Sequence, residues 1–191
     1  MSENVAPVAG QVSADGQFRW DGGQWVPIPH GEMEPTPWTR PMQLATAGFF
    51  VLEAIVSLGV TALTVNHDSM LRAMQAQGSL PSGTDANTVV NVGLGFAYFF
   101  IGLFLVLELF VALGSYLRWR WIFWVALIVS GLGGIGAVTN LGNFTNPDRS
   151  YIPLWGIAVN EVFALGSLAL FIWLLVGRIK FGTWAMKKPG A

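Results

Sequence analysis

The chain has 191 residues, of which 53% are hydrophobic and only 11% are charged, whereas about 25% of residues are charged in an average soluble domain. Cysteine is absent, which excludes disulfides, thiolate metal sites and cysteine nucleophiles. With only two histidines a histidine-based metal centre is not expected, and no motif implies a cofactor. The net charge of −1 says little about partners.

Residues 1–41 form a polar tail rich in Gly and Pro, and its middle part predicts a small β-hairpin over residues 18–27. In "SADGQFRWDGGQWVPIP", Phe18 and Trp20 alternate on one arm, an Asp-Gly-Gly turn follows, and Trp25 lies on the returning arm. An isolated hairpin is marginally stable in water, so a partner surface, either protein or membrane, would stabilise it. We therefore regard these three aromatic residues as candidates for partner docking.

Four apolar runs in residues 42–177 are long enough to cross a bilayer core about 30 Å thick as helices. They do not show the period-2 alternation of a barrel strand. The predicted spans are residues 44–65, 89–116, 121–141 and 152–176, and residues 178–191 form a basic tail. The predicted fold class is an all-α integral membrane protein, a four-transmembrane-helix bundle with a short N-terminal cytoplasmic β-hairpin.

The basic residues near the predicted span ends indicate the orientation of the chain. Two of them, Arg72 and Arg149, fall on one side of the bilayer, and seven fall on the other side: Arg40, Arg118, Arg120, Arg178, Lys180, Lys187 and Lys188. This distribution predicts that both termini face the cytoplasm, with the chain in the plasma membrane. Because the basic residues follow this topology signal, we expect no nucleic-acid partner. Five tryptophans at or near the predicted span ends are expected at the headgroup region: Trp38, Trp119, Trp121, Trp155 and Trp184.

The first loop outside the bundle, residues 66–88, is predicted to carry one short helix. Asp68 or Ser69 is the expected N-cap, and Gly78 the expected end. His67 and Asp68 are adjacent there, but further metal ligands are scarce on this side, so a solvated helix cap is favoured over a metal site.

Three carboxyl groups, those of Glu53, Glu108 and Glu161, lie inside predicted spans. Facing lipid would cost each about 2.5–3.5 kcal/mol, so we expect them to face the bundle interior in the neutral form. Ser57 extends the polar stripe of Glu53 by one helical turn, and Asn160 lies beside Glu161. The residues are either structural, each donating a hydrogen bond to a neighbouring helix, or part of a proton or cation pathway.

The third span carries small residues at four-residue spacing, Ala126, Ser130 and Gly134. Small residues at this spacing let helices approach closely in membranes. We expect this span to be central to helix packing and to be the antiparallel neighbour of the second span, because the "YLRWR" link between them is short.

The motif in the tail supports one resemblance. "SADGQFRWDGGQWVPIP" resembles the N-terminal Trp-Asp-Gly-x-x-Trp motif that precedes membrane spans in many uncharacterised actinobacterial proteins, and "RPMQLATAGFF" and "LRWRW" resemble segments of four-span members of that group. The resemblance implies a bacterial plasma membrane and an interaction tail, and it implies no activity.

Two functional hypotheses follow from the residues. The leading one is a non-enzymatic multipass protein, a scaffold or accessory subunit that docks a membrane protein partner, or a second copy of itself, through its tail and helix faces. The alternative is a proton-linked transporter or channel subunit that uses the intramembrane glutamates. An integral membrane enzyme ranks third, because no catalytic constellation is present.

Overall fold

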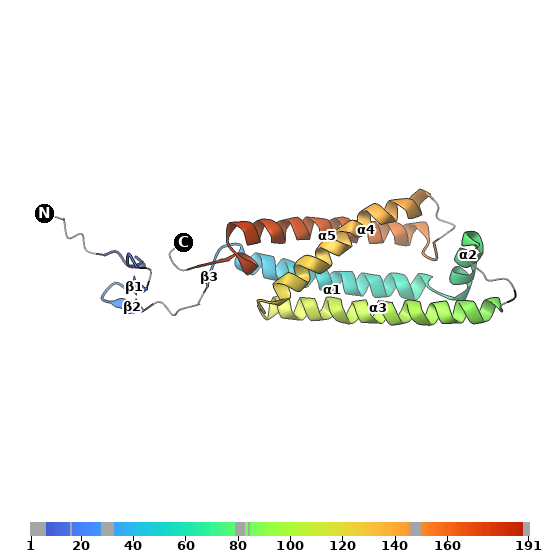
Figure 1. The fold of residues 1–191 in the computed structure, drawn as a ribbon, viewed down its shortest axis with the longest axis horizontal. Coiled ribbons are helices and arrows are strands. Elements are labelled where there is room, and N and C mark those ends of the chain that lie inside the picture. Colours follow the sequence, from blue (N-terminus) through green and yellow to red (C-terminus); the bar gives the residue numbers. More distant parts are fainter. Residues whose placement is uncertain are drawn as a thin grey trace.

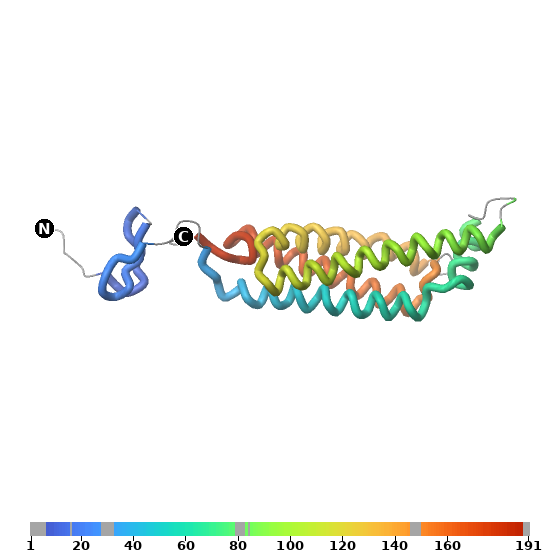
Figure 2. The backbone as a smooth tube through the Cα atoms, turned by 90° about the horizontal axis from the view of Figure 1, so that it is seen from below, coloured from blue at the N-terminus to red at the C-terminus, as the bar shows by residue number. Residues whose placement is uncertain are grey.

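The computed structural model describes residues 7–15, 17–27, 33–78, 83, 85–145 and 150–188. Its four long helices are α1 (Thr39–Thr64), α3 (Ala86–Tyr116), α4 (Ile122–Thr145) and α5 (Leu154–Lys180). A short helix α2 (His67–Gln77) lies at one end of the bundle, and the beginning of α1 and the end of α5 lie at the other, which we call the terminal end (Figures 1 and 2). At 1.5 Å per residue each long helix spans more than about 35 Å, enough to cross a bilayer core.

The long helices are apolar on their outward faces as well as inside. Large apolar side chains protrude from every long helix, and examples that are each more than 60% exposed are Ile55 on α1, Phe99 on α3, Leu132 on α4 and Val162 on α5. Such surfaces are unsuited to water and suited to lipid. All four helices qualify as membrane spans by length and composition, so the predicted fold class, a four-helix membrane bundle with a small N-terminal sheet, is confirmed.

The helices are arranged as two closely packed pairs, α1 with α3 and α4 with α5. The interpretation of α3 and α4 as neighbours holds only near their short link, because α4 then crosses the bundle diagonally and packs chiefly on α5 (Figure 1). The face of α4 that carries small residues explains why α4 packs on α5. A Cβ added to Gly134 would lie 3.1 Å from Cα of Leu168, so α5 approaches here as closely as glycine permits.

The N-terminal hairpin consists of β1 (Phe18–Trp20) and β2 (Trp25–Pro27), which pair antiparallel with Trp20 opposite Trp25. Asp21 builds the turn, because its Oδ1 accepts hydrogen bonds of 2.8 Å from the backbone amides of Gly23 and Gln24. A third segment lies along the other side of β1, where the Trp20 amide donates to Gln11 O at 2.8 Å. This third segment, which the sequence motif did not predict, gives both edges of β1 a hydrogen-bonding neighbour.

At the terminal end, a second small sheet joins the segment before α1 to the segment after α5. Strand β3 (Glu34–Pro35) pairs antiparallel with β4 (Met186–Lys187), and the short 3-10 helix η2 (Thr183–Ala185) precedes β4. Ala185 O accepts hydrogen bonds from the hydroxyls of Thr36 at 2.7 Å and Thr39 at 3.0 Å. The segment after α5 is therefore tied to the start of α1.

Candidate functional site

A cavity of about 190 Å³, partly open to the surface of the bundle, is lined by all four long helices. We call it the central cavity. Its polar lining residues are Glu53 and Ser57 from α1, Glu108 from α3, Asn140 from α4 and Asn160 from α5. One water occupies about 30 Å³ in the liquid, so the cavity has room for several water molecules.

Two features of the sequence produce this cavity. Glu53 and Ser57 are four residues apart, which places both side chains on the same inward face of α1. On α4 the facing residues are Gly133 and Gly136, whose lack of side chains leaves the volume open.

The carboxyl group of Glu108 lacks a protein partner for one oxygen. Its Oε2 atom is buried and accepts no hydrogen bond from any residue that the structure describes. A buried carboxylate without a partner is costly, and a proton, a cation or bound water would remove that cost. The group is thus placed to exchange such a species through the cavity.

Four of the five residues singled out as a candidate intramembrane polar site therefore line one cavity: Glu53, Ser57, Glu108 and Asn160. Glu161, the fifth, is not among the lining residues, and its buried Oε2 also lacks a partner in the described part of the chain. Asn140 was not singled out from the sequence. It lies next to Leu141, where the third span was expected to end, and α4 continues for another turn to Thr145.

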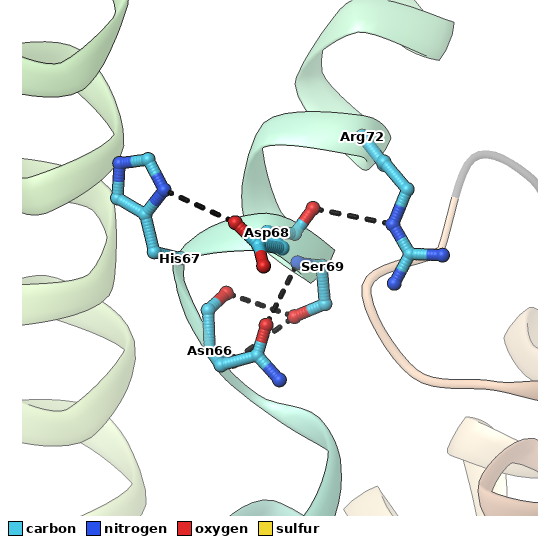
Figure 3. A network of polar contacts seen from close by, with 5 residues as sticks. All are labelled: Asn66, His67, Asp68, Ser69 and Arg72. Atoms are coloured by element: carbon cyan, nitrogen blue, oxygen red, sulfur yellow. Dashed lines mark hydrogen bonds and ion pairs between the residues drawn. The ribbon is translucent and has the colours of Figure 1, made fainter.

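Helix α2 lies at the end of the bundle opposite the termini, and the residues around its start are drawn in Figure 3. Asn66 is the N-cap and forms a capping box with Ser69, so the prediction of Asp68 or Ser69 as N-cap is wrong by a few residues. Gly78 ends the helix in a left-handed conformation, as expected. His67 Nδ1 lies 3.7 Å from Asp68, and no group of three or more candidate metal ligands is found among the described residues.

Arg72 points from α2 toward the segment that precedes α5, and its Nε donates a 3.3 Å hydrogen bond to Asp68 O (Figure 3). It lines a cavity of about 520 Å³ between α2 and that segment, the α2 cavity.

The candidate docking residues of the tail form a small aromatic surface. The rings of Trp20 and Trp25 meet edge to face with centroids 5.5 Å apart, and Phe18 is partly buried on the same strand as Trp20. Trp25 remains 39% exposed. Hydrogen bonds from the Gln24 and Gly23 amides hold the pKa of the Asp21 carboxyl below its ordinary value.

The candidate packing residues of α4 are all buried. Ala126, Ser130 and Gly134 lie on the face that contacts the rest of the bundle, and Ser130 Oγ donates a 2.6 Å hydrogen bond to Ala126 O. The hydroxyl is satisfied within its own helix, so this face needs no polar partner from a neighbour.

The terminal end holds the largest buried residue, Trp184, which the sequence analysis placed in the headgroup region. That interpretation is wrong, because Trp184 has no exposed surface. Its ring meets Phe123 edge to face at 5.3 Å, and its Nε1 donates a 3.0 Å hydrogen bond to Trp119 O. Trp184 and Ala185 adopt left-handed backbone conformations with φ of 56° and 51°, which turn the chain back into the bundle. Nothing in the local sequence signals this turn except Gly182, whose φ is 131°.

Comparison with protein-family models, curated proteins and solved structures gives no match to this chain. The class of protein therefore rests on the fold itself. The chain is a four-span, multipass transmembrane helical protein whose four long helices line a cavity that contains two carboxyl groups.

Proposed function

We propose that the protein is a proton-linked membrane subunit in which Glu53 and Glu108 take up and release a proton inside the central cavity. The observation that carries this proposal is the convergence of the two carboxyl groups, one from α1 and one from α3, on a single cavity with room for water. Acidic residues that face a water-filled cavity within a bundle are the usual components of proton relays in membranes.

The other polar groups of the cavity suit this role. Ser57, Asn140 and Asn160 can each donate and accept hydrogen bonds, and can therefore hold a chain of waters beside the acids. A purely structural acid would instead be expected to donate its proton to a neighbouring helix, and Glu108 Oε2 has no such partner among the described residues.

Under this proposal both termini face the cytoplasm and the α2 end faces outward. The support is the distribution of basic residues: the beginning of α1, the α3–α4 link, the end of α5 and the following segment carry seven of them. Arg72 lies at the α2 end, and Arg149 falls outside the described residues. An excess of Lys and Arg marks the cytoplasmic side.

The test is proton flux into proteoliposomes that contain the purified protein, driven by a potassium diffusion potential and followed with a pH-sensitive dye. Glu53→Gln and Glu108→Gln should each abolish the flux, because an amide cannot release a proton. Glu161→Gln is the matched control, since Glu161 does not line the cavity, and it should leave the flux unchanged. Flux that survives both cavity substitutions contradicts the proposal.

A second function, docking of a partner through the tail, is favoured by the exposed aromatic hairpin. Trp25 and Val26 of β2 are 39% and 40% exposed on a strand pair that is ordered by its turn. Purification from native membranes in mild detergent, with the full chain and with a chain lacking residues 1–40, tests it. A partner that co-purifies with the full chain only, and is lost with Trp20→Ala, supports docking; identical behaviour of the two forms contradicts it.

A further inference from the structure

The central cavity is one of three that follow each other along the bundle. A second cavity of about 300 Å³ shares Asn140 and Asn160 with it and also includes Gln77 and Asn143. We call this one the connecting cavity. It shares Ser150, Tyr151 and Ile152 with the α2 cavity. Shared lining residues mean that each cavity directly adjoins the next.

The three cavities lie in series between the α2 end and the acid pair, and polar and apolar residues line them in similar measure. At 1.5 Å per residue, Asn160 lies about 9 Å along α5 from its start at Leu154, and Glu53 lies about 16 Å along α1 from its end at Thr64. Side-chain amides therefore line the boundary between the connecting and central cavities, partway between the α2 end and the acids.

The interior on the other side of the acids is closely packed and mostly apolar. Between the central cavity and the terminal end lie apolar side chains that are each at most 6% exposed: Met42, Phe50, Val111, Phe123, Leu170, Leu174 and Trp184. The same halves of α1 and α3 also bury the polar side chains of Gln43, Thr46 and Ser115. Hydrogen bonds hold the end of the chain against this region: Trp184 Nε1 donates to Trp119 O, and Ala185 O accepts from the hydroxyls of Thr36 and Thr39. We call this region the terminal core.

From this asymmetry we propose that the acid pair has access to water and small hydrophilic solutes from the α2 end only, through the boundary formed by Asn140 and Asn160. The inference rests on the proposed function for its purpose, because it assigns the side from which water brings protons to the acid pair. Transfer of a proton to the other side of the membrane then requires a transient opening of the terminal core. Arg72 is the charged residue that lines the α2 cavity within the described part of the chain, so it sets the charge preference of the entrance against cations. A hydrated metal cation would have to pass the positively charged Arg72, whereas a proton can be relayed from water to water. The entrance therefore favours the proton over metal cations as the exchanged species.

The natural chain has no cysteine, so single cysteines can be introduced without removing any. Ser57→Cys and Asn160→Cys place a thiol in the central cavity, and Asn143→Cys places one in the connecting cavity. Ser130→Cys, in the buried face of α4, and Ile128→Cys, on the outward face of the same helix, are the matched controls. The full-length variants are reconstituted in one orientation and treated from either side with a membrane-impermeant thiosulfonate, either cationic or anionic.

Thiosulfonates react with the thiolate, which forms in water and not in lipid or a packed core, so the cavity positions should react at least about ten-fold faster than both controls. We expect this reaction from the α2 side and not from the terminal side. Labelling of Ser57→Cys and Asn160→Cys from the terminal side, from both sides or from neither overturns the proposal. If neither position is labelled from either side, Asn143→Cys shows where the path is blocked. Labelling of Asn143→Cys places the block at the Asn140 and Asn160 boundary, and no labelling places it at the entrance.

The entrance charge is tested in the same system. Arg72→Gln, combined with Asn143→Cys, should speed labelling by the cationic reagent and slow labelling by the anionic reagent. Unchanged rates overturn the role of Arg72. These outcomes are separate from the proposed function: labelling from the α2 side together with proton flux that survives Glu53→Gln and Glu108→Gln would leave a one-sided aqueous cavity and refute the proton relay.

Discussion

Replacing Trp184 with alanine should strongly destabilise the terminal end of the bundle. The indole has no exposed surface, packs edge to face on Phe123 at 5.3 Å, and donates a 3.0 Å hydrogen bond to Trp119 O. Truncating a buried aromatic residue to alanine costs about 3–5 kcal/mol. Loss of the hydrogen bond contributes about another 1 kcal/mol. We therefore expect the free energy of unfolding to fall by at least about 3 kcal/mol.

The assay is equilibrium unfolding of the purified protein in mixed micelles with increasing SDS, followed by far-UV circular dichroism. Trp184→Phe keeps a six-membered aromatic ring but removes the hydrogen-bond donor and the rest of the indole, so it should cost more than about 1 kcal/mol and less than Trp184→Ala. Trp155→Ala, at a side chain that is 49% exposed, is the matched control and should change stability by less than about 1 kcal/mol. A Trp184→Ala protein as stable as the control would refute the closed terminal core.

Three further predictions follow from particular contacts. Gly182→Ala should lower the thermal midpoint, because φ is +131° and an added Cβ would lie 2.6 Å from a backbone oxygen, while Gly59→Ala, with open space around it, should not. Gly134→Leu should separate α4 from α5 and give polydisperse protein on size-exclusion chromatography, whereas Gly136→Leu, which faces the central cavity, should remain monodisperse and lose proton flux. Acidification should loosen the hairpin turn: the pKa of Asp21 is lowered in the folded state, so its stabilisation is present above the ordinary value of 3.8 and is lost as the pH falls through the folded-state pKa. The Gly23 amide resonance should therefore shift at acidic pH in the natural chain and stay fixed in Asp21→Asn; an identical titration in both would contradict this.

Much of the architecture could be predicted because the bilayer imposes strong rules on sequence. Long apolar runs must be helices, and most charged residues lie outside them, so the four spans were visible in the chain. The Trp20 and Trp25 arms were visible for another reason, the Asp-Gly-Gly turn between them. The inward stripe of Glu53 and Ser57 followed from helical periodicity alone. That these residues share a cavity with Glu108 and Asn160 could not follow, since it depends on the relative rotation of four helices.

The features that escaped prediction are those set by tertiary contacts. Trp184 was interpreted as an interfacial anchor because it follows a span. Its burial depends on two consecutive left-handed residues, which propensity does not anticipate. The preference of α4 for α5 over α3 depends on the fit of Gly134 to Leu168, two residues far apart in the chain. Asn140 was overlooked because it lies close to where hydropathy ends the third span.

The most direct test of the account is the reaction of the intramembrane carboxyl groups with dicyclohexylcarbodiimide, an apolar reagent that modifies protonated acids within membranes. A single bulky adduct would fill a cavity of about 190 Å³, so Glu53 and Glu108, which line it together, cannot both be modified. In a Glu161→Gln protein, mass spectrometry should show one adduct per chain, distributed between Glu53 and Glu108, and no adduct after both are changed to glutamine. Chains that carry an adduct on both residues, or on neither, would contradict a shared, exchangeable acid pair.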